Sequence, residues 1–594
     1  MNPALQSNNA GLDYARLVRK SKRLEPIPGA PTLRLAILSD AATQQFVPLL
    51  RALFHENGIN AEIYEGAFDA LELEILNPAS ALYSFQPDFI VLANATQALR
   101  GRYYQAAAGD FLETATSRVV EAWDAIGDIS TARIIQFNYS LPYERPFGNY
   151  DLKVPHSFYS VAAALNLRLA EGARKRPNVL VCDVEAMASW IGRKNWFDDR
   201  LWNMAKSFCR LDHLPLVAQS VVDIAFAAFG RLVKCVVLDL DNTLWGGVVG
   251  DDGALGIVIG PHGDGEAFFH FQQYLLSLKR RGILLAVCSK NNPEAALSPF
   301  LENPGMALSR DDFAVFVANW ENKADNLRTI RETLAIGFDS MVFLDDNPFE
   351  RNLVRDRLPE IIVPELPEDP ADYVRAVSEL NLFETVSFSD EDVERAEQYR
   401  QEAGRRDVAR AFSNIDDFLK SLEMKIEVAR FEPARIPRIA QLLQRSNQFN
   451  LTTHRYNDAE CEKMMLDGNC VPLYASLRDR FGDHGLISIV ILRRTPDALT
   501  ISDWLMSCRV LARGVEQFLM NYVVYIARRE GLPKITGEYL PTAKNAMVKE
   551  FYAQFGFEKV TEKGGRTVWH LDPATYEPRT VYIREEGEVS MAAS

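Results

Sequence analysis

The sequence predicts a multidomain α/β protein, and three observations support that fold class. The chain has 594 residues, more than one hydrophobic core normally holds, so roughly three or four domains are expected. From residue 32 to about residue 372, short apolar segments alternate with helical patterns, as in layered parallel sheets. Beyond that point a hairpin pattern is followed by single strands and helices, which is typical of an α+β unit.

The composition narrows the classes of partner and compartment. The apolar fraction of 47% and the charged fraction of 24% are those of globular proteins. A net charge of −15 argues against a nucleic-acid partner. Seven scattered cysteines without a C-x-x-C pair indicate a reducing, cytoplasmic location. The first residues lack a signal-peptide pattern, and the longest apolar stretch, Leu214–Gly230, is too short and too polar to span a bilayer, so no membrane partner is expected.

The first domain is expected at residues 32–230, after a leader at 1–31 that ends in the Pro-rich "PIPGAP". Its predicted strands are four apolar segments separated by helical patterns, and they lie at 33–40, 88–95, 132–139 and 178–186. This alternation predicts a layered parallel sheet.

A second α/β unit is expected at residues 231–375. Its four predicted strands are apolar on both faces, as buried parallel strands are, and they lie at 235–241, 283–289, 313–319 and 340–346. A helix pattern at 268–282 separates the first two. The charged stretch that follows, 376–410, is expected to form a solvated connecting helix.

The last domain is expected at residues 411–583, with a tail at 584–594. A Gly-containing turn inside 472–494 predicts a hairpin. The elements expected after it are a strand at 498–508, a helix at 516–531, a strand at 534–540 and a helix at 545–557.

Reactive side chains follow all four predicted strands of the middle domain. They are Asp239, Asp241 and Thr243 after the first strand, Ser289 at the end of the second, Lys323 after the third, and Asp345 and Asp346 after the fourth. Because ligands bind at the carboxyl ends of parallel strands, these side chains are expected to meet in one site. Each aspartate alone could instead belong to a strand-ending turn.

The residue types fit phosphoryl transfer, which needs a nucleophile, charge neutralisation and a proton donor for the leaving oxygen. Asp239 can attack phosphorus, and Asp241 can act first as general acid and then as general base. The predicted phosphate-binding residues are Thr243, Ser289 and Lys323. Mg²⁺ prefers a few carboxylates, and its predicted ligands are Asp239, Asp241, Asp345 and Asp346, with Asp346 expected to bind more strongly than Asp345.

This pattern resembles the haloacid dehalogenase (HAD) phosphatase superfamily. The D-x-D-x-T motif of that superfamily is matched by Asp239, Asp241 and Thr243, and its later motifs fall on Ser289, Lys323 and the pair at 345–346. The resemblance implies a HAD-like Rossmannoid domain. The intervals between its motifs are too short for a large cap domain, so a bulky or carrier-bound substrate could reach the site.

A closer resemblance is to the FkbH-like family, through "DLDNTLWGGVVGDDG", "AVCSKNN", "NWENKADNL", "FLDDNPFERN", "RSNQFNLTT" and "SCRVLARGVE". It implies an enzyme that dephosphorylates a small phosphoglyceryl-type, three-carbon substrate. The enzyme would then load the acyl group onto the phosphopantetheine arm of an acyl carrier protein in polyketide or related biosynthesis. Two alternatives stay open: a stand-alone phosphatase acting on a soluble phosphometabolite, and a non-catalytic scaffold for assembly-line partners.

The last domain resembles GNAT acyltransferases, whose R/Q-x-x-G-x-G/A loop is matched by Arg509, Ala512 and Gly514. The residues that this resemblance implies for acyl or pantetheine binding are Arg509, Arg513, Gly514, Asn545 and Tyr552, with Tyr552 protonating a departing thiolate. Ala512 stands where the first glycine is expected, which favours a carrier-bound arm over coenzyme A.

Cys508 and His484 are further catalytic candidates in this domain. Cys508 could hold the acyl group as a thioester, with arginines nearby favouring its thiolate, or it could be a small core residue. His484 could act as a base, or it could be a turn histidine. Cys288 precedes Ser289 on a strand and is expected to point away from the phosphate pocket.

The first domain resembles an SGNH hydrolase, with Ser39 in the place of the serine block. The Gly-Asp-Ser of that family is absent, and neither His156 nor His213 lies in a D-x-x-H motif. A degenerate or docking domain is therefore expected.

Overall fold

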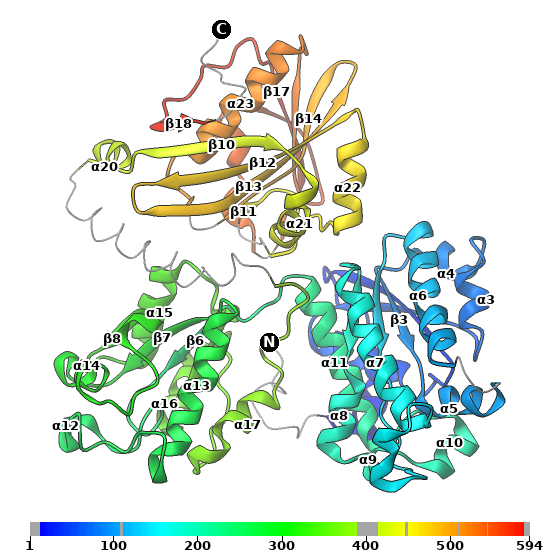
Figure 1. Cartoon of the computed structure of the whole chain (residues 1–594). Coiled ribbons are helices and arrows are strands. Elements are labelled where there is room, and N and C mark those ends of the chain that lie inside the picture. Colours follow the sequence, from blue (N-terminus) through cyan, green and yellow to red (C-terminus); the bar gives the residue numbers. More distant parts are fainter. Residues whose placement is uncertain are drawn as a thin grey trace. The chain divides into compact units, whose positions relative to one another are not determined.

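The computed structural model of the chain describes residues 12–106, 111–388, 414–445, 449–507, 510–542 and 544–586 (Figure 1). The chain divides into two compact units, residues 2–228 and 229–594. Most of the predicted connecting helix, from residue 389 onward, lies outside the described residues. The same holds for residues 1–11 of the predicted leader and for residues 587–594 of the predicted tail.

The first unit is built on a five-stranded parallel sheet of order β2-β1-β3-β4-β5. The strands are β1 (Thr32–Ser39), β2 (Asn60–Glu65), β3 (Phe89–Ala93), β4 (Arg133–Phe137) and β5 (Val179–Cys182). Helices α6 (Phe111–Ile129) and α7 (Phe158–Arg174) pack on one face through a continuous apolar cluster. Helices α2 (Val47–Glu56) and α11 (Leu214–Ala228) contact each other and the edge strands β2 and β5. The four strands predicted here are confirmed, and β2 was not predicted.

Part of the predicted leader is a helix that packs on this unit. Helix α1 (Tyr14–Ser21) begins at Asp13, whose side chain accepts a hydrogen bond from the backbone N–H of Arg16. Leu17 is fully buried, and Arg16 and Lys20 both form ion pairs with Glu56 of α2. Leu17 is the one buried residue of α1, so the segment lacks the wide apolar stripe that marks a core helix in a sequence.

Helix α11 lies within the one segment of the described residues, Leu211–Ala228, that is long and apolar enough to cross a membrane. That segment is 61% buried inside the protein. A core helix passes the same test of length and composition, and most residues of α11 are buried in the first unit.

The middle part of the chain forms a four-stranded parallel sheet of order β8-β7-β6-β9. The strands are β6 (Cys235–Leu238), β7 (Leu284–Ser289), β8 (Phe313–Ala318) and β9 (Met341–Leu344). All four were predicted, as was the helix now seen as α13 (Glu266–Arg280). Helices α15 (Lys323–Leu334) and α16 (Pro348–Arg357) share an apolar cluster with the strands. Because β7 and β9 lie on opposite sides of β6, the chain changes direction at β6, which places a crevice at its carboxyl end.

The carboxyl-terminal part is an α+β unit on a nine-stranded mixed sheet of order β16-β17-β15-β14-β13-β12-β10-β18, with β11 on β14. Its strands are β10 (Met424–Arg430), β11 (Phe449–Asn450), β12 (Cys470–Asp479), β13 (Gly482–Thr495), β14 (Ala498–Met506), β15 (Ile535–Tyr539), β16 (Glu558–Lys563), β17 (Arg566–Leu571) and β18 (Ile583–Glu585). Its longest helix is α23 (Val515–Arg529), and α21 (Ile436–Arg445) and α22 (Asp458–Leu466) pack together.

The hairpin, the two strands and the helix predicted for this unit are present as β12–β13, β14, β15 and α23. The predicted helix at 545–557 is wrong: that segment holds a 3₁₀ turn, Ala546–Val548, and one short helix, α24 (Phe551–Gln554). Its aromatic residues face the core rather than forming a helical stripe.

Candidate active site

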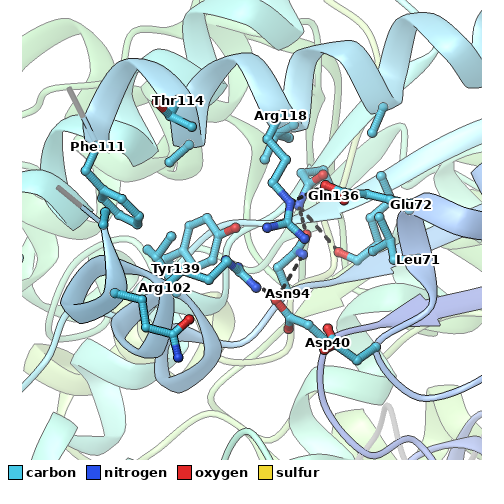
Figure 2. A pocket seen from close by; sticks show the side chains of 18 of the residues that line it. Asp40, Leu71, Glu72, Asn94, Arg102, Phe111, Thr114, Arg118, Gln136 and Tyr139 are labelled. Carbon is cyan, nitrogen blue, oxygen red and sulfur yellow. Dashed lines mark hydrogen bonds and ion pairs between the residues drawn. The ribbon is translucent and has the colours of Figure 1, made fainter.

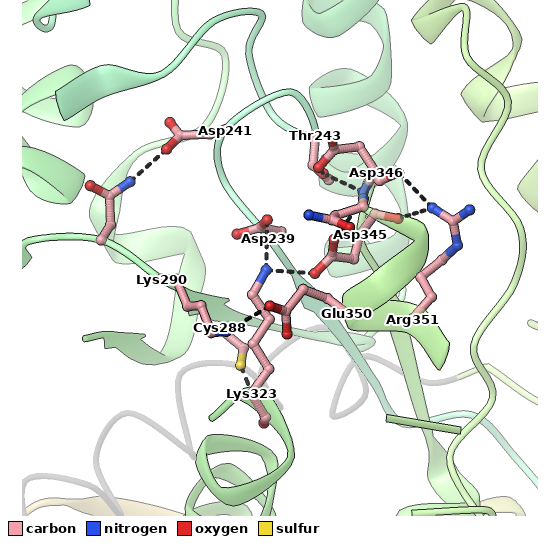
Figure 3. Close-up of polar contacts among 12 residues, drawn as sticks. Asp239, Asp241, Thr243, Cys288, Lys290, Lys323, Asp345, Asp346, Glu350 and Arg351 are labelled. Atoms are coloured by element: carbon pink, nitrogen blue, oxygen red, sulfur yellow. Dashed lines mark hydrogen bonds and ion pairs between the residues drawn. The ribbon is translucent and has the colours of Figure 1, made fainter. Parts of the chain in front are cut away.

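The acidic residues meet at the carboxyl ends of β6 and β9. These strands pair in register, with Leu238 opposite Leu344, so the residues that follow them leave the sheet side by side. The backbone N–H of Asp239 donates to the carbonyl of Leu344 (3.0 Å). Asp239, Asp345 and Asp346 each offer a carboxylate oxygen, and these oxygens lie within 4.8 Å of one another (Figure 3).

Lys323, the first residue of α15, binds this cluster from the side. Its Nζ lies 2.7 Å from Oδ2 of Asp239 and 2.5 Å from Oδ2 of Asp345, and its side chain is almost fully buried. Burial alone would lower the pKa of Lys323, but the two carboxylates raise that pKa above its ordinary value. The lysine therefore stays charged and offsets part of the negative charge.

One positive charge does not neutralise three carboxylates. Burial, together with the charge of Asp239, raises the pKa of Asp345 to about 7. The pKa of Asp346 is raised in the same direction and by the same two causes. Oδ1 of Asp239 is buried and makes no hydrogen bond within the described part of the chain. Hard carboxylate oxygens suit Mg²⁺, so Asp239, Asp345 and Asp346 could together hold such an ion.

Asp241 lies apart from this cluster, so its predicted role as a carboxylate ligand of the metal is not supported. Its Oδ1 accepts hydrogen bonds from Nε1 of Trp245 (2.9 Å) and the N–H of Val249 (3.0 Å). Its Oδ2 accepts one from Nδ2 of Asn291 (2.8 Å). Burial raises the pKa of Asp241, which favours a proton-donating form. The predicted proton donor, Asp241, thus lies apart from the carboxylates of Asp239, Asp345 and Asp346 (Figure 3).

Thr243 is also placed differently from the prediction. It is fully buried, and its Oγ1 accepts a hydrogen bond from the N–H of Asp346 (3.2 Å) and donates to Oδ1 of Asp346 (3.5 Å). Thr243 therefore holds the loop after β9 instead of facing a phosphate group. Ser289, at the end of the neighbouring strand β7, is buried at the same edge of the sheet. Cys288 faces the opposite way, as expected, because its Sγ lies 3.7 Å from the carbonyl of Lys323 inside the apolar cluster.

Three supporting residues had no role assigned to them from the sequence. Asn291 and Trp245 orient Asp241, as described above. Arg351 donates through Nη1 to the carbonyls of Asp345 (2.8 Å) and Asp346 (2.7 Å), which fixes the acidic loop. Arg351 could have been found from the sequence, because it lies in the first turn of a helix that begins two residues after Asp346 and so stays close to the acidic loop.

The candidates in the carboxyl-terminal unit are not brought together as predicted. Cys508 and Arg509 lie outside the described residues. Asn545 is fully buried and organises its own loop, donating to the carbonyls of Asn450 (2.9 Å) and Leu540 (2.8 Å). Tyr552 is fully buried under β15, where its ring fills the space above Gly537. Burial raises the pKa of Tyr552 further above its ordinary value. Both side chains are buried, and their predicted roles in acyl or pantetheine binding stay predictions.

His484 and Arg513 form a buried polar cluster with Asp479. Nε2 of His484 lies 2.9 Å from Oδ2 of Asp479, and Nη1 of Arg513 lies 3.2 Å from the same imidazole nitrogen. His484 is 2% exposed, so its imidazole is buried within this cluster, and its predicted role as a base stays a prediction.

A groove of about 460 Å³ lies at the start of α23 and is lined in part by Arg513 and Gly514. Gly514 precedes α23 in the left-handed conformation (φ +86°), as a glycine allows. Ala512 has φ +61°, which is strained for a residue with a Cβ, so the loop keeps its turn without the expected first glycine. His484, Asn545 and Tyr552 are not among the residues that line this groove.

A histidine that the sequence reasoning did not select occupies a more favourable position. Nδ1 of His454 lies 2.8 Å from Oδ1 of the buried Asp503, and the imidazole is 46% exposed. The hydrogen bond with Asp503 raises the pKa of His454. Asp503 also accepts from Oγ1 of Thr452 (2.6 Å) and from the hydroxyl of Tyr456 (3.0 Å). The quoted segment "RSNQFNLTT" ends one residue before His454, so sequence gave a partial signal.

The comparisons with known proteins agree with this organisation. A sequence model described as the FkbH N-terminal domain matches residues 34–226. The chain is also similar to a solved structure of the N-terminal part of the protein BF1531 from Bacteroides fragilis, which contains a phosphatase domain complexed with Mg. The two share 41% identity and a TM-score of 0.61 over 63% of this chain and 100% of that one. This chain belongs to the FkbH-like family.

Acetyltransferase structures match this FkbH-like chain at a much lower level of similarity. The ribosomal-protein-S18-alanine N-acetyltransferase of Escherichia coli matches 25% of this chain and 93% of its own, at 13% identity and a TM-score of 0.20. The GNAT domain of PAT from S. lividans matches 24% of this chain and 89% of its own, at 18% identity and a TM-score of 0.20. No curated protein matches the chain.

Proposed function

We propose that this FkbH-like protein is a Mg²⁺-dependent phosphatase of the HAD type, coupled to acyl transfer. It would remove phosphate from a phosphoglyceryl-type substrate and load the acyl group onto an acyl carrier protein. The observation that carries the phosphatase step is the buried cluster of Asp239, Asp345 and Asp346 with Lys323 at the β6–β9 crevice.

The acidic cluster fits Mg²⁺, which would be held by Asp239, Asp345 and Asp346. When bound, the cation would reduce the repulsion between the carboxylates and an incoming phosphate. Lys323 and Ser289, at the ends of neighbouring elements, would hold the phosphoryl oxygens. Arg351 and Thr243 keep the acidic loop in place through the contacts described above.

In the first step an oxygen of Asp239 attacks phosphorus, a P–O bond to Asp239 forms, and the P–O bond to the leaving oxygen breaks. Asp241 donates its proton to that leaving oxygen. In the second step Asp241 takes a proton from water, which attacks the aspartyl-phosphate and releases inorganic phosphate and free Asp239. Asp241 now faces Asn291, so this scheme requires its side chain to turn toward Asp239 during the reaction.

The carboxyl-terminal unit supports the proposal of acyl transfer in a different way. The groove at the start of α23 offers room for a pantetheine arm. His454 does not line this groove, but a buried carboxylate orients its imidazole through Nδ1, which leaves Nε2 available as a base. The predicted thioester at Cys508 stays a prediction.

The direct test is to incubate the full chain with 1,3-bisphosphoglycerate and Mg²⁺, with and without candidate carrier proteins. Phosphate release is measured, and the carriers are analysed by intact-mass spectrometry. Phosphate release together with a glyceryl adduct on one carrier supports the whole proposal. Phosphate release without any adduct would support the stand-alone phosphatase, and no release would contradict both.

A further inference from the structure

A cavity of about 570 Å³ lies in the first unit, at the carboxyl ends of three neighbouring strands (Figure 2). Asp40 follows β1, Asn94 follows β3, and Tyr139 follows β4 by two residues. In the strand order β2-β1-β3-β4-β5, the neighbours of β1 lie on opposite sides of it, so the sheet changes winding direction between β1 and β3. In open parallel sheets, ligands bind in the crevice at this point.

The floor of the cavity is a connected polar network. Nε2 of Gln136 donates to Oδ1 of Asn94 (2.9 Å), and Nδ2 of Asn94 approaches Oδ2 of Asp40 (3.5 Å). Asp40, which is 5% exposed, also accepts from the N–H of Ala95 (2.7 Å) and from Nη2 of Arg102 (3.0 Å). A buried network in which the members satisfy one another is rigid. The guanidinium group of Arg102 is therefore held in one orientation.

Two guanidinium groups face the same cavity. Asp40 engages one edge of Arg102, and a guanidinium has five N–H donors, so donors remain for a ligand. Arg118, from α6, forms an ion pair with Glu72 in which both side chains are more than 40% exposed. Tyr139 lines the same cavity; burial and the charge of Asp40 raise its pKa, and the positive charges of Arg102 and Arg118 oppose that rise.

The rest of the lining combines apolar walls with a few polar side chains, which are those of Asp69, Gln105 and Thr114. Leu71, Leu99, Phe111 and Val119 form the walls, and among the described residues no Ser, Cys, Lys or His lines the cavity. Ser39, the residue in the place of a catalytic serine, is buried, where its Oγ donates to the carbonyl of Ala93 (2.6 Å) and accepts from the N–H of Ala41 (2.9 Å). This chemistry is that of a binding site.

We propose that this cavity binds a small organic anion with an apolar body. Its carboxylate or phosphate group would accept hydrogen bonds from Arg102 and Arg118, since guanidinium groups bind such oxyanions in a bidentate manner. The exposed pair of Arg118 with Glu72 contributes little, so Arg118 can exchange that partner for the ligand. The site lies wholly in the first unit and does not depend on the phosphatase.

The test uses the full chain and four probes that share one apolar body: hexanoate, hexyl phosphate, hexylamine and hexanol. Binding is measured by calorimetry and by the shift of the melting temperature. Hexanoate or hexyl phosphate is expected to bind saturably, and the tighter of the two identifies the preferred head group. Arg118→Gln should weaken that binding by roughly tenfold or more, the loss expected for a hydrogen bond to a charged group.

Two further variants make the result specific. Ala115→Phe fills the cavity from α6 without changing its charge, and it should abolish binding while the fold persists by circular dichroism. Arg168→Gln breaks a comparable exposed pair, with Glu113, outside the cavity, and it should bind like the wild type. Equal binding of hexylamine or hexanol, unchanged affinity in Arg118→Gln, or no binding of either acid at millimolar concentration would overturn the proposal.

Discussion

Replacing Lys323 by Met removes the only positive charge that contacts both Asp239 and Asp345 among the described residues. At 2.7 Å and an effective dielectric constant of about 20, one such contact has a gross attraction of about 6 kcal/mol. Desolvation of the buried lysine offsets much of this gain, and breaking a buried pair by removing one partner typically costs about 3–5 kcal/mol. For a domain of this size, that loss corresponds to a fall in melting temperature of roughly 10 °C.

The assay is thermal unfolding of the full chain without added metal, comparing Lys323→Met with a double variant that also carries Asp345→Asn. Removing the carboxylate charge at 345 relieves the repulsion that Lys323 no longer offsets, so the double variant should recover a large part of the loss. Lys534→Met, which breaks an exposed pair with Asp497 at 3.6 Å, is the matched control and should change stability by less than about 0.5 kcal/mol. A fall below 2 °C in Lys323→Met, or no recovery in the double variant, would refute this electrostatic reasoning.

Three further predictions concern the metal, the exposed histidine and the thiol. Asp346→Asn should shift the Mg²⁺ titration of phosphate release to at least roughly tenfold higher concentration. Glu360→Gln, a change at an exposed position, should leave the titration unchanged. Coincident titration curves for Asp346→Asn and the wild type would contradict the role of Asp346 as a ligand. The pKa of His454 is raised in the folded state. Its ion pair with Asp503 therefore stabilises the fold fully below the ordinary histidine pKa, and this contribution is lost as the pH rises through the folded pKa. In denaturant unfolding, His454→Asn should be less stable than the wild type at pH 5.5 and nearly equal to it at pH 8.5, and a difference in stability that grows with pH would contradict this reasoning. Cys508→Ala should lose carrier loading by intact mass while keeping phosphate release, and loading at the wild-type rate would exclude a covalent relay through that thiol.

The sequence was most informative where strands are buried on both faces. The apolar runs that became β6 to β9 identified the sheet of the middle domain, and the polar residues after them predicted the site, because parallel strands bring their carboxyl ends to one edge. Strand β2 was missed because its residues are only partly buried and lack an apolar run. The prediction of a helix at 545–557 was wrong, because the aromatic residues of this segment pack into the core instead of lying along one face of a helix.

The roles of individual side chains were harder to predict than their location. Thr243 and Asp241 follow Asp239 by a few residues, yet one turns toward Asp346 and the other toward Asn291. A motif fixes spacing along the chain but not the hydrogen-bond partner that each side chain meets. Asn545, Tyr552 and His484 show the same limit, because all three are buried and burial is not visible in a short motif.

The central claim is that Asp239 attacks the substrate's phosphorus within a Mg²⁺-binding carboxylate cluster. The most direct measurement is phosphate release from 1,3-bisphosphoglycerate by wild type and Asp239→Asn, with the folding of both proteins checked by circular dichroism. The wild type is expected to release phosphate only with Mg²⁺. The folded Asp239→Asn protein should lose activity by at least roughly a thousandfold, because an amide is neither a nucleophile nor a good metal ligand. Undiminished phosphate release by folded Asp239→Asn would contradict the account.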